Sequence, residues 1–480
     1  MRRTGVAAFA LAWMAVGAAH GQVLQGGLEL RWGDAAPSAQ ARLAPKFEAA
    51  LAQDGGGRIA LDADQARRGA GDLYALANRR VAVSYAIGKS TGMPVIDAIV
   101  PADAPAHAAP HVRGGRPDGV AKATLGTTRW VTVACRFSDI ADEQKPIGFF
   151  RDQYGEVAGQ LGHYWREVSY DKVDLTGSDA AGWYSLPHPR SHYVTGAGDN
   201  QRANLDALFD DCTAAADADV DFSGVVGINI MFNGDLDGYA WGGGRCATLD
   251  GRNRCWSATW NPPWSFGNLA PLAHEMGHGY GLPHSDNSDG DDDTYDNPWD
   301  VMSDGWSNAT SDPVYGTLPK HINMLQRERM GWVDAARKRS FDAGTPRTRL
   351  QLDFASLRGA GNAQMLVLQT PASPDPYSGA FYTVEARRRT GTYESRLAGD
   401  AVIIHRVGGD YRYEAESQDA ERPPANVSNN EGSMFKSGEA WISPDGLFSL
   451  YVEAATATGF TVIVGDRGRV TGGEGPRRRR

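Results

Sequence analysis

Several features are scarce in this sequence, and each scarcity excludes a class of protein. After residue 21 no apolar run reaches the length of a membrane-spanning helix, so we expect no membrane span. Positive charge is outweighed, with 48 Lys and Arg against 58 Asp and Glu, and the net charge of −10 argues against a nucleic-acid partner. Only four cysteines occur, and none of them forms the Cys-x-x-Cys pair of thiolate zinc sites.

The first 21 residues have the pattern of a secretory signal peptide. Arg2 and Arg3 precede an apolar stretch at 6–19, and Ala19-His-Gly21 offers small residues for cleavage. No cysteine stands at that position, which argues against a lipoprotein. We therefore expect a secreted protein, either extracellular or periplasmic.

The even number of cysteines in an exported chain suggests two disulfides. Cys135, Cys212, Cys246 and Cys255 allow three connectivities. We favour Cys246–Cys255, which closes a short loop, together with Cys135–Cys212.

Composition and pattern divide the chain into five parts. The region at 22–120 ends in a Pro/Ala linker at 101–110, and we interpret it as a propeptide, with a permanent accessory domain as the alternative. Within it, 38–53 and 63–78 suggest helices, and 80–86 and 94–99 suggest strands. The parts are a signal peptide (1–21), this propeptide or accessory domain (22–120), a central domain (125–338), a β-rich domain (340–466) and a basic tail (467–480).

The most informative run is His274-Glu-Met-Gly-His-Gly-Tyr-Gly-Leu-Pro-His284. His274 and His278 are four residues apart, which places them on one face of a helix within reach of one metal ion. Gly281 allows a sharp turn after the helix, so that His284 supplies a third nitrogen from outside it. Three imidazoles with an open fourth position are the ligands of catalytic zinc. Glu275, beside the first ligand, is the expected general base.

This run resembles the motif of the metzincin clan of zinc endopeptidases. The clan also carries a methionine turn beneath the metal, and Met302 in Asp300-Val-Met-Ser fits that place, 18 residues after His284. The resemblance implies an α+β fold: a metzincin-type catalytic domain with a twisted mixed sheet, a zinc helix and the methionine turn. A β-sandwich domain follows it, and a small N-terminal pro-region precedes it.

A closer resemblance is to gametolysin-like and immune-inhibitor-like secreted peptidases. It covers most of 128–334 and rests on Tyr164-Trp-Arg-Glu-Val-Ser-Tyr170, Gly182-Trp-Tyr-Ser-Leu-Pro187, Asp300-Val-Met302 and Met330-Gly-Trp332. Two features depart from other metzincins. Asp304 stands where astacins and serralysins have a tyrosine, and Gly114 stands where the latency segment of matrixins has its cysteine. Latency therefore needs another ligand or steric blocking.

The expected function is that of a secreted zinc-dependent endopeptidase, made as a zymogen and acting on a protein or peptide substrate. Zinc lowers the pKa of a bound water, and Glu275 moves a proton from this water to the leaving amine. Two alternatives stay open: a binding or adhesion protein with a vestigial metzincin domain, and a zinc amidohydrolase acting on non-peptide amides. The sequence does not indicate an oligomeric state.

Three stretches rich in glycine or aspartate suggest further roles. Gly238, Tyr239, Ala240, Trp241 and Gly242 form the candidate edge strand that binds extended peptide, with a plain glycine-rich loop as the alternative. Asn233, Asp235 and Asp237 match the first half of a calcium loop, but its twelfth position is Gly244. The stretch at 286–300 is also dense in aspartate. The loop at 233–237 is a possible Ca²⁺ site, and the stretch at 286–300 is interpreted either as a Ca²⁺ site or as a solvated loop.

Hydrophobic periodicity supplies the remaining elements. The pattern favours one long helix at 147–168, and further helices at 204–218, 268–280 and 320–330. A buried strand is expected at 225–232 and a first strand at 128–137. Short strands follow at 350–354, 364–369, 380–386, 400–406, 448–454 and 458–464, a pattern typical of a β-sandwich.

Overall fold

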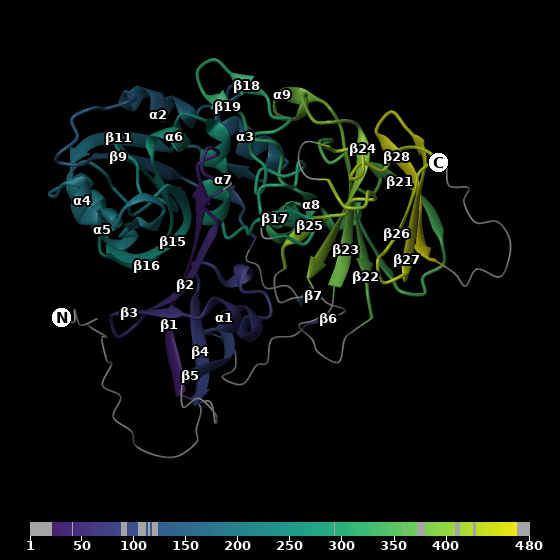
Figure 1. Cartoon of the computed structure of the whole chain (residues 1–480), viewed down its shortest axis with the longest axis horizontal. Helices are drawn as coiled ribbons and strands as arrows, with labels where there is room; N and C mark the ends of the chain where they lie inside the picture. Colours follow the sequence, from purple (N-terminus) through teal and green to yellow (C-terminus); the bar gives the residue numbers. More distant parts are fainter. Residues whose placement is uncertain are drawn as a thin grey trace, which may run out of the picture.

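The protein is described here from a computed structural model, in which three regions follow one another along the chain (Figure 1). The expected signal peptide, most of the Pro/Ala linker, Gly114 and nearly all of the basic tail lie outside the described residues. These are 22–40, 42–87, 94–103, 112–113, 116–117, 123–291, 293–359, 361–371, 380–408, 413–425 and 429–467.

One large mixed sheet runs through the N-terminal and central regions. Its order is β11-β9-β14-β16-β15-β1-β2-β3, and β4 pairs with β1 and β5. β11, β9, β14 and β16 are parallel to one another, whereas β15 is antiparallel to β16. The strands are β1 (Gln22–Ala35), β2 (Lys46–Gln53), β3 (Arg58–Leu61), β4 (Arg80–Ile87), β5 (Pro94–Pro101), β9 (Trp130–Arg136), β11 (Asp179–Ser185), β14 (Gly227–Phe232), β15 (Tyr239–Leu249) and β16 (Arg252–Asn261).

Alternation along the central strands separates two cores. Val131 and Val133 of β9 pack on one face with α5, whereas Trp130 and Ala134 pack on the other with α3 and α7. The helices are α1 (Ala63–Ala70), α2 (Ile147–Gln153), α3 (Leu161–Val168), α4 (Arg190–Tyr193), α5 (Leu205–Ala216), α6 (Pro263–Phe266), α7 (Leu269–Gly279), α8 (Met324–Arg329) and α9 (Gly391–Glu394). None of the helices in the described part of the chain is long and apolar enough to cross a membrane.

Two helix predictions are wrong, and the helix expected at 63–78 ends at Ala70, because Gly71 adopts a positive φ of 74°. The expected helix at 147–168 is broken into α2 and α3, because Gly159 adopts a positive φ of 96° and Val157, placed on its apolar face, is 70% exposed. The expected helix at 38–53 is largely a strand, since β2 pairs with β1 from Lys46 to Gln53. Long-range pairing outweighs local helix propensity there.

Both favoured disulfides are present. Cys135 of β9 is joined to Cys212 of α5, which ties a helix to the sheet beneath it. Cys246 and Cys255 face each other across β15 and β16 and form the second bond. No free cysteine remains among the described residues.

The C-terminal region consists of two sheets that share one core. A six-stranded sheet, β17-β25-β24-β23-β22-β20, faces a four-stranded sheet, β21-β28-β27-β26, and apolar side chains of both sheets pack together. β17 follows His284 directly, so the site region and this sandwich share a strand. The strands are β17 (Ser285–Asn287), β20 (Lys338–Asp342), β21 (Thr348–Asp353), β22 (Met365–Gln369), β23 (Ala380–Arg387), β24 (Ala401–Gly408), β25 (Ala415–Ser417), β26 (Ala440–Ile442), β27 (Phe448–Ala455) and β28 (Gly459–Asp466).

Candidate metal centre and active site

The buried helix α7 carries two of the three predicted histidine ligands. Leu272 and Met276 pack into the core below it, which leaves His274 and His278 on the side that faces β1 and β15. The helix ends at Gly279, and Gly281 follows with a φ of 88°. This left-handed turn reverses the chain, so that His284 returns to the two helical histidines.

The three imidazoles meet at their Nε2 atoms. The Nε2 of His278 lies 3.0 Å from that of His274 and 3.2 Å from that of His284. The Nδ1 of His274 donates to the carbonyl of Val301 at 2.6 Å, and the Nδ1 of His278 donates to that of Leu282 at 2.7 Å. A carbonyl only accepts, so when these two rings are neutral each Nε2 atom presents a lone pair.

A fourth side chain reaches the same point from β1. The Oδ2 of Asp34 lies 3.3 Å from the Nε2 of His274 and 3.2 Å from that of His278. Its Oδ1 lies 2.7 Å from the Nε2 of His284. Burial alone would raise the pKa of Asp34, but the facing imidazoles hold it well below its usual range. The carboxylate is therefore ionised.

This cluster has the chemistry of a metal site. Imidazole nitrogens of three histidines and the carboxylate of Asp34 converge on one point. The buried Oδ2 of Asp34 has no hydrogen-bond donor. Burial lowers the pKa of His278 to about 3, so its imidazole is neutral, the form that binds a metal. A bound divalent cation would balance the buried charge and satisfy the crowded acceptors.

Glu275 lies beside the cluster without taking part in it. Its side chain is 1% exposed, and its Oε2 has no hydrogen-bond partner. Burial, together with the charge of Asp34, raises the pKa of Glu275 well above its usual range. A buried carboxyl group with a raised pKa, next to a metal site, is suited to proton transfer.

The strand β15 passes directly over α7 because Gly242 has no side chain. A Cβ atom there would lie 2.5 Å from the carbonyl oxygen of Glu275 and 2.8 Å from its Oε2. Tyr239, Ala240, Trp241 and Gly242 belong to β15, and Gly238 lies in the bend just before it. One side of this strand pairs with β16 and the other with β1. In the full-length chain β1 therefore covers the edge of β15 that was predicted to bind substrate.

The predicted methionine turn lies below the helix. The Sδ of Met302 would be 2.4 Å from a Cβ on Gly277, which shows how closely the turn packs against α7. Asp300 accepts a hydrogen bond from the Met302 amide at 2.9 Å and holds the turn. Asp304 pairs with buried Lys320 at 3.0 Å, so the position that holds a tyrosine in astacins serves a structural contact.

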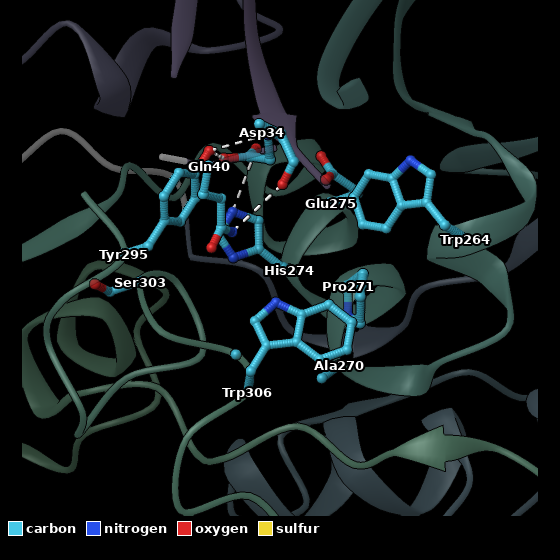
Figure 2. Close-up of a pocket in the computed structure, with 12 residues that line it drawn as sticks. Asp34, Gln40, Trp264, Ala270, Pro271, His274, Glu275, Tyr295, Ser303 and Trp306 are labelled. Atoms are coloured by element: carbon cyan, nitrogen blue, oxygen red, sulfur yellow. Dashed lines mark hydrogen bonds and ion pairs between the residues drawn. The ribbon is translucent and has the colours of Figure 1, made fainter. Parts of the chain in front are cut away.

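A small cavity opens beside Glu275 and Asp34 (Figure 2). Its walls include the indoles of Trp264 and Trp306, and Tyr295 closes the side next to Asp34. The hydroxyl of Tyr295 donates to the Oδ1 of Asp34 at 2.9 Å and accepts from the Ala35 amide at 3.2 Å. Aromatic walls beside a polar centre are typical of a site that takes apolar side chains.

The residues proposed for calcium have protein partners. The side-chain amide of Asn233 donates to the carbonyls of Ile140 and Asp142. The carboxylate of Asp237 accepts from Lys46 and from the Trp241 indole, each at 3.0 Å. The carbonyl of Asp235 accepts from an arginine. Calcium binding at this loop stays a prediction.

The aspartate-rich loop after β17 brings other carboxylates together. Oxygens of Asp289, Asp291 and Asp296 lie within 4.8 Å of one another. Burial, helped by neighbouring aspartates, raises the pKa of Asp296 to about 7. No ion is needed to explain this shift, and calcium at this loop also stays a prediction.

Reasoning from the sequence missed Asp34 and Tyr295. Asp34 lies 240 residues before His274 and stands in no motif, so no local signal marks it as part of the site. Tyr295 lies between the third histidine and the methionine turn, in a stretch whose pattern is dominated by aspartates. Both residues are 9% exposed or less, and both join the site through long-range contacts.

Comparison with known proteins gives no family. No family model matches the sequence, and no curated protein does. Among solved structures, wild-type OgpA from Akkermansia muciniphila is similar over 74% of this chain and 96% of its own, with 13% identity and a TM-score of 0.24. Such a score is too low to carry an argument about fold or function.

Proposed function

We propose that this protein is a secreted zinc-dependent endopeptidase of the metzincin clan. The observation that carries the proposal is the convergence of three histidine Nε2 atoms beside a buried glutamate with an unpartnered oxygen. The ligand set of nitrogen and carboxylate donors suits Zn²⁺. The methionine turn and the strand above α7 support the assignment to the clan, and the closer resemblance to gametolysin-like and immune-inhibitor-like peptidases stays a prediction.

His274, His278 and His284 would hold the metal. Hydrogen bonds from the Nδ1 atoms to carbonyl groups orient the rings of His274 and His278. Zinc held by three neutral imidazoles would lower the pKa of a coordinated water to near 7 and would polarise a peptide carbonyl.

Glu275 would act as general base and then as general acid. It accepts a proton from the attacking water and delivers it to the amine that leaves. Its burial keeps its pKa raised, which makes the second transfer easier than it would be for an exposed glutamate.

The strand β15 would align the substrate. An extended peptide pairs with a free strand edge through main-chain hydrogen bonds, and side chains then fill neighbouring pockets. The Trp264 and Trp306 walls lie next to Glu275, so they would contact residues close to the bond that is cut.

The test compares the native chain with a Glu275→Gln chain, for zinc content and for casein hydrolysis, each before and after limited proteolysis. We expect about one zinc per chain in both proteins, because Glu275 is not a ligand, and hydrolysis only with the native chain. Equal hydrolysis by the Glu275→Gln chain would contradict the role of this residue. A digest of a peptide library separates a peptidase from a hydrolase of other amides.

A further inference from the structure

We propose that His321 forms a pH-sensitive joint between the central domain and the C-terminal sandwich. Its doubly protonated ring holds Glu167 of α3 and Glu394 of α9 together, and loss of one proton in alkaline solution loosens the contact between the two helices. These residues take no part in the candidate metal centre, so the joint does not depend on the proposed function.

The segment before α8 places His321 at the border of the two domains. His321 is 1% exposed, and its Nε2 lies 2.8 Å from the Oε1 of Glu167. Its Nδ1 lies 3.3 Å from the Oε2 of Glu394, and neither of these two buried atoms has a hydrogen-bond partner elsewhere. Each ring nitrogen therefore faces a carboxylate, one from the central domain and one from the sandwich.

This arrangement suits a charged imidazole. A neutral imidazole has one N–H group and one lone pair, so it donates to one carboxylate and turns its lone pair toward the other. The imidazolium has two N–H groups and can satisfy both carboxylates. The geometry around His321 thus matches the doubly protonated ring, and the two domains are joined through its two nitrogens.

The helix α9 is docked on the central domain at this point. Tyr393 is 0% exposed and packs in the same core cluster as Leu161 and Tyr164 of α3. Its hydroxyl accepts from the Gly159 amide and donates to the carbonyl of Gln160, each at 3.2 Å. In Figure 1 α9 lies at the border between the central region and the sandwich. Movement of α9 away from α3 would therefore expose part of the central core.

The charges around His321 balance only when its ring is protonated. The groups that face it are His163, Tyr164 and Glu167 on α3, Arg327 on α8, Glu385 and Arg387 on β23, and Tyr393 and Glu394 on α9. Three of these groups are carboxylates and two are guanidinium groups. The imidazolium supplies the third positive charge, whereas a neutral ring leaves one negative charge unbalanced at the buried border.

The direction of the pH effect follows from the pKa of His321. Burial alone would lower this pKa, but Glu394 and Glu167 raise it above its usual value. A histidine in an unfolded chain has a pKa of about 6.5. The folded chain holds the proton more tightly, so the joint contributes its full stability below about pH 6.5. This contribution is lost as the pH rises through the pKa of the folded state.

The joint is connected both to solvent and to the methionine turn. The side chain of Glu167 is 28% exposed, which gives the proton a way out. Arg387 pairs with Glu394 and donates to the carbonyl of His321 at 3.4 Å and to that of Trp299 at 2.6 Å. The joint and the segment just before the methionine turn thus share one buried cation.

The experiment uses the full chain with His321→Gln, Glu167→Gln and His192→Gln. His192 on α4 is exposed and stacks on His188, which makes it the matched control. Thermal unfolding of each protein is followed from about pH 5.5 to about pH 9.5. Hydrogen–deuterium exchange of peptides from α3 and α9 is measured over the same range, with β27 as the reference and with correction for intrinsic exchange rates.

Below about pH 6.5 the native chain should unfold roughly 2–4 °C above His321→Gln, and this difference should disappear in alkaline solution. Amide exchange in α3 and α9 should rise relative to β27 over the same range in the native chain only. Glu167→Gln should lose its stability at a lower pH than the native chain, because one of the two carboxylates that retain the proton is gone. His192→Gln should follow the native chain.

A difference between the native chain and His321→Gln that stays constant with pH would overturn the proposal, because the ring would then act by packing alone. Exchange in α3 and α9 that does not change with pH in the native chain would also overturn it. If His321→Gln does not fold, Glu167→Gln decides, and a pH profile identical to that of the native chain would refute the joint.

Discussion

Single atoms decide how closely the strand, the helix and the metal ligands approach one another. Gly242 allows β15 to touch the carbonyl and carboxyl groups of Glu275, and Gly277 admits the sulfur of Met302 from below. The ligand face of α7 is thus packed from both sides by residues that accept no extra methyl group. At such positions a change of one carbon atom shifts the backbone or side chains around it.

Gly242→Ala tests this packing. The added Cβ would lie 2.5 Å from the carbonyl oxygen of Glu275, so β15 must move away from α7. We expect a loss of about 1–3 kcal/mol in the free energy of unfolding and a fall in kcat, as measured by urea denaturation and peptide hydrolysis after proteolysis. Gly148→Ala on α2 is the control, because a Cβ there meets nothing within 4 Å. Equal stability of the two variants would contradict the close approach.

The elements that position the site are each set by a different balance of forces. α7 is buried along its whole length, so its place follows from the apolar residues below it and the strand above it. Apolar residues recur at helical spacing throughout 147–168, but the chain turns at Gly159 and forms two helices, α2 and α3. Strands of the sandwich follow their sequence pattern more closely, because alternating side chains fill one common core.

The strand β24 gives a test at this scale through its buried histidine. His405 is 0% exposed and neither ring nitrogen has a hydrogen-bond partner, and burial lowers the pKa of His405 to about 4. In an unfolded chain a histidine has a pKa of about 6.5. Between these two values the unfolded state binds more protons, so acid destabilises the fold.

We therefore expect this histidine to reduce the free energy of unfolding by about 3 kcal/mol as the pH falls from about 6.5 to about 4. His405→Leu should remove that part of the pH dependence. The measurement is urea unfolding of both proteins at several pH values between 4 and 7.5. If the free energy of unfolding fell equally with pH in both proteins, His405 would not be the cause of the acid destabilisation.

At the scale of the whole molecule, the C-terminal sandwich supports the candidate active site. Arg387 of β23 donates to the carbonyl of Trp299, just before the methionine turn, at 2.6 Å, and pairs with Glu385 and Glu394. Glu385 in turn accepts from the Met324 amide at the start of α8. All of these charged groups are buried. The sandwich is thus joined to the turn beneath the metal ligands by a buried ionic network.

Arg387→Met tests this connection. The substitution removes the cation that pairs with buried Glu385 and Glu394, which should cost about 3–5 kcal/mol in the free energy of unfolding. Thermal unfolding should show a lower midpoint, and metal should be lost at lower temperature than from the native chain. The exposed pair of Arg349 and Glu453 supplies the control, and Arg349→Met should change the midpoint little. Equal midpoints for the two variants would contradict a supporting role.

The sequence by itself determined the three histidines, Glu275, Gly281, Met302, both disulfides and most strands of the sandwich. These features depend on residue spacing along the chain, because a helix turn, a tight turn or strand alternation is a local property. The spacing in His274-Glu-Met-Gly-His278 already brings two imidazoles to one side of a helix.

Only the tertiary structure decided what lies opposite those ligands. Asp34 reaches His274 across 240 residues, and β1 pairs with β15 instead of leaving a free edge. The same long-range pairing turned 46–53 from an expected helix into β2. The energy of such strand pairing depends on which surfaces meet after folding, so the local spacing of apolar residues does not predict it. The three histidines that could bind a metal were thus predictable from the chain, whereas their contact with Asp34 was set by the fold.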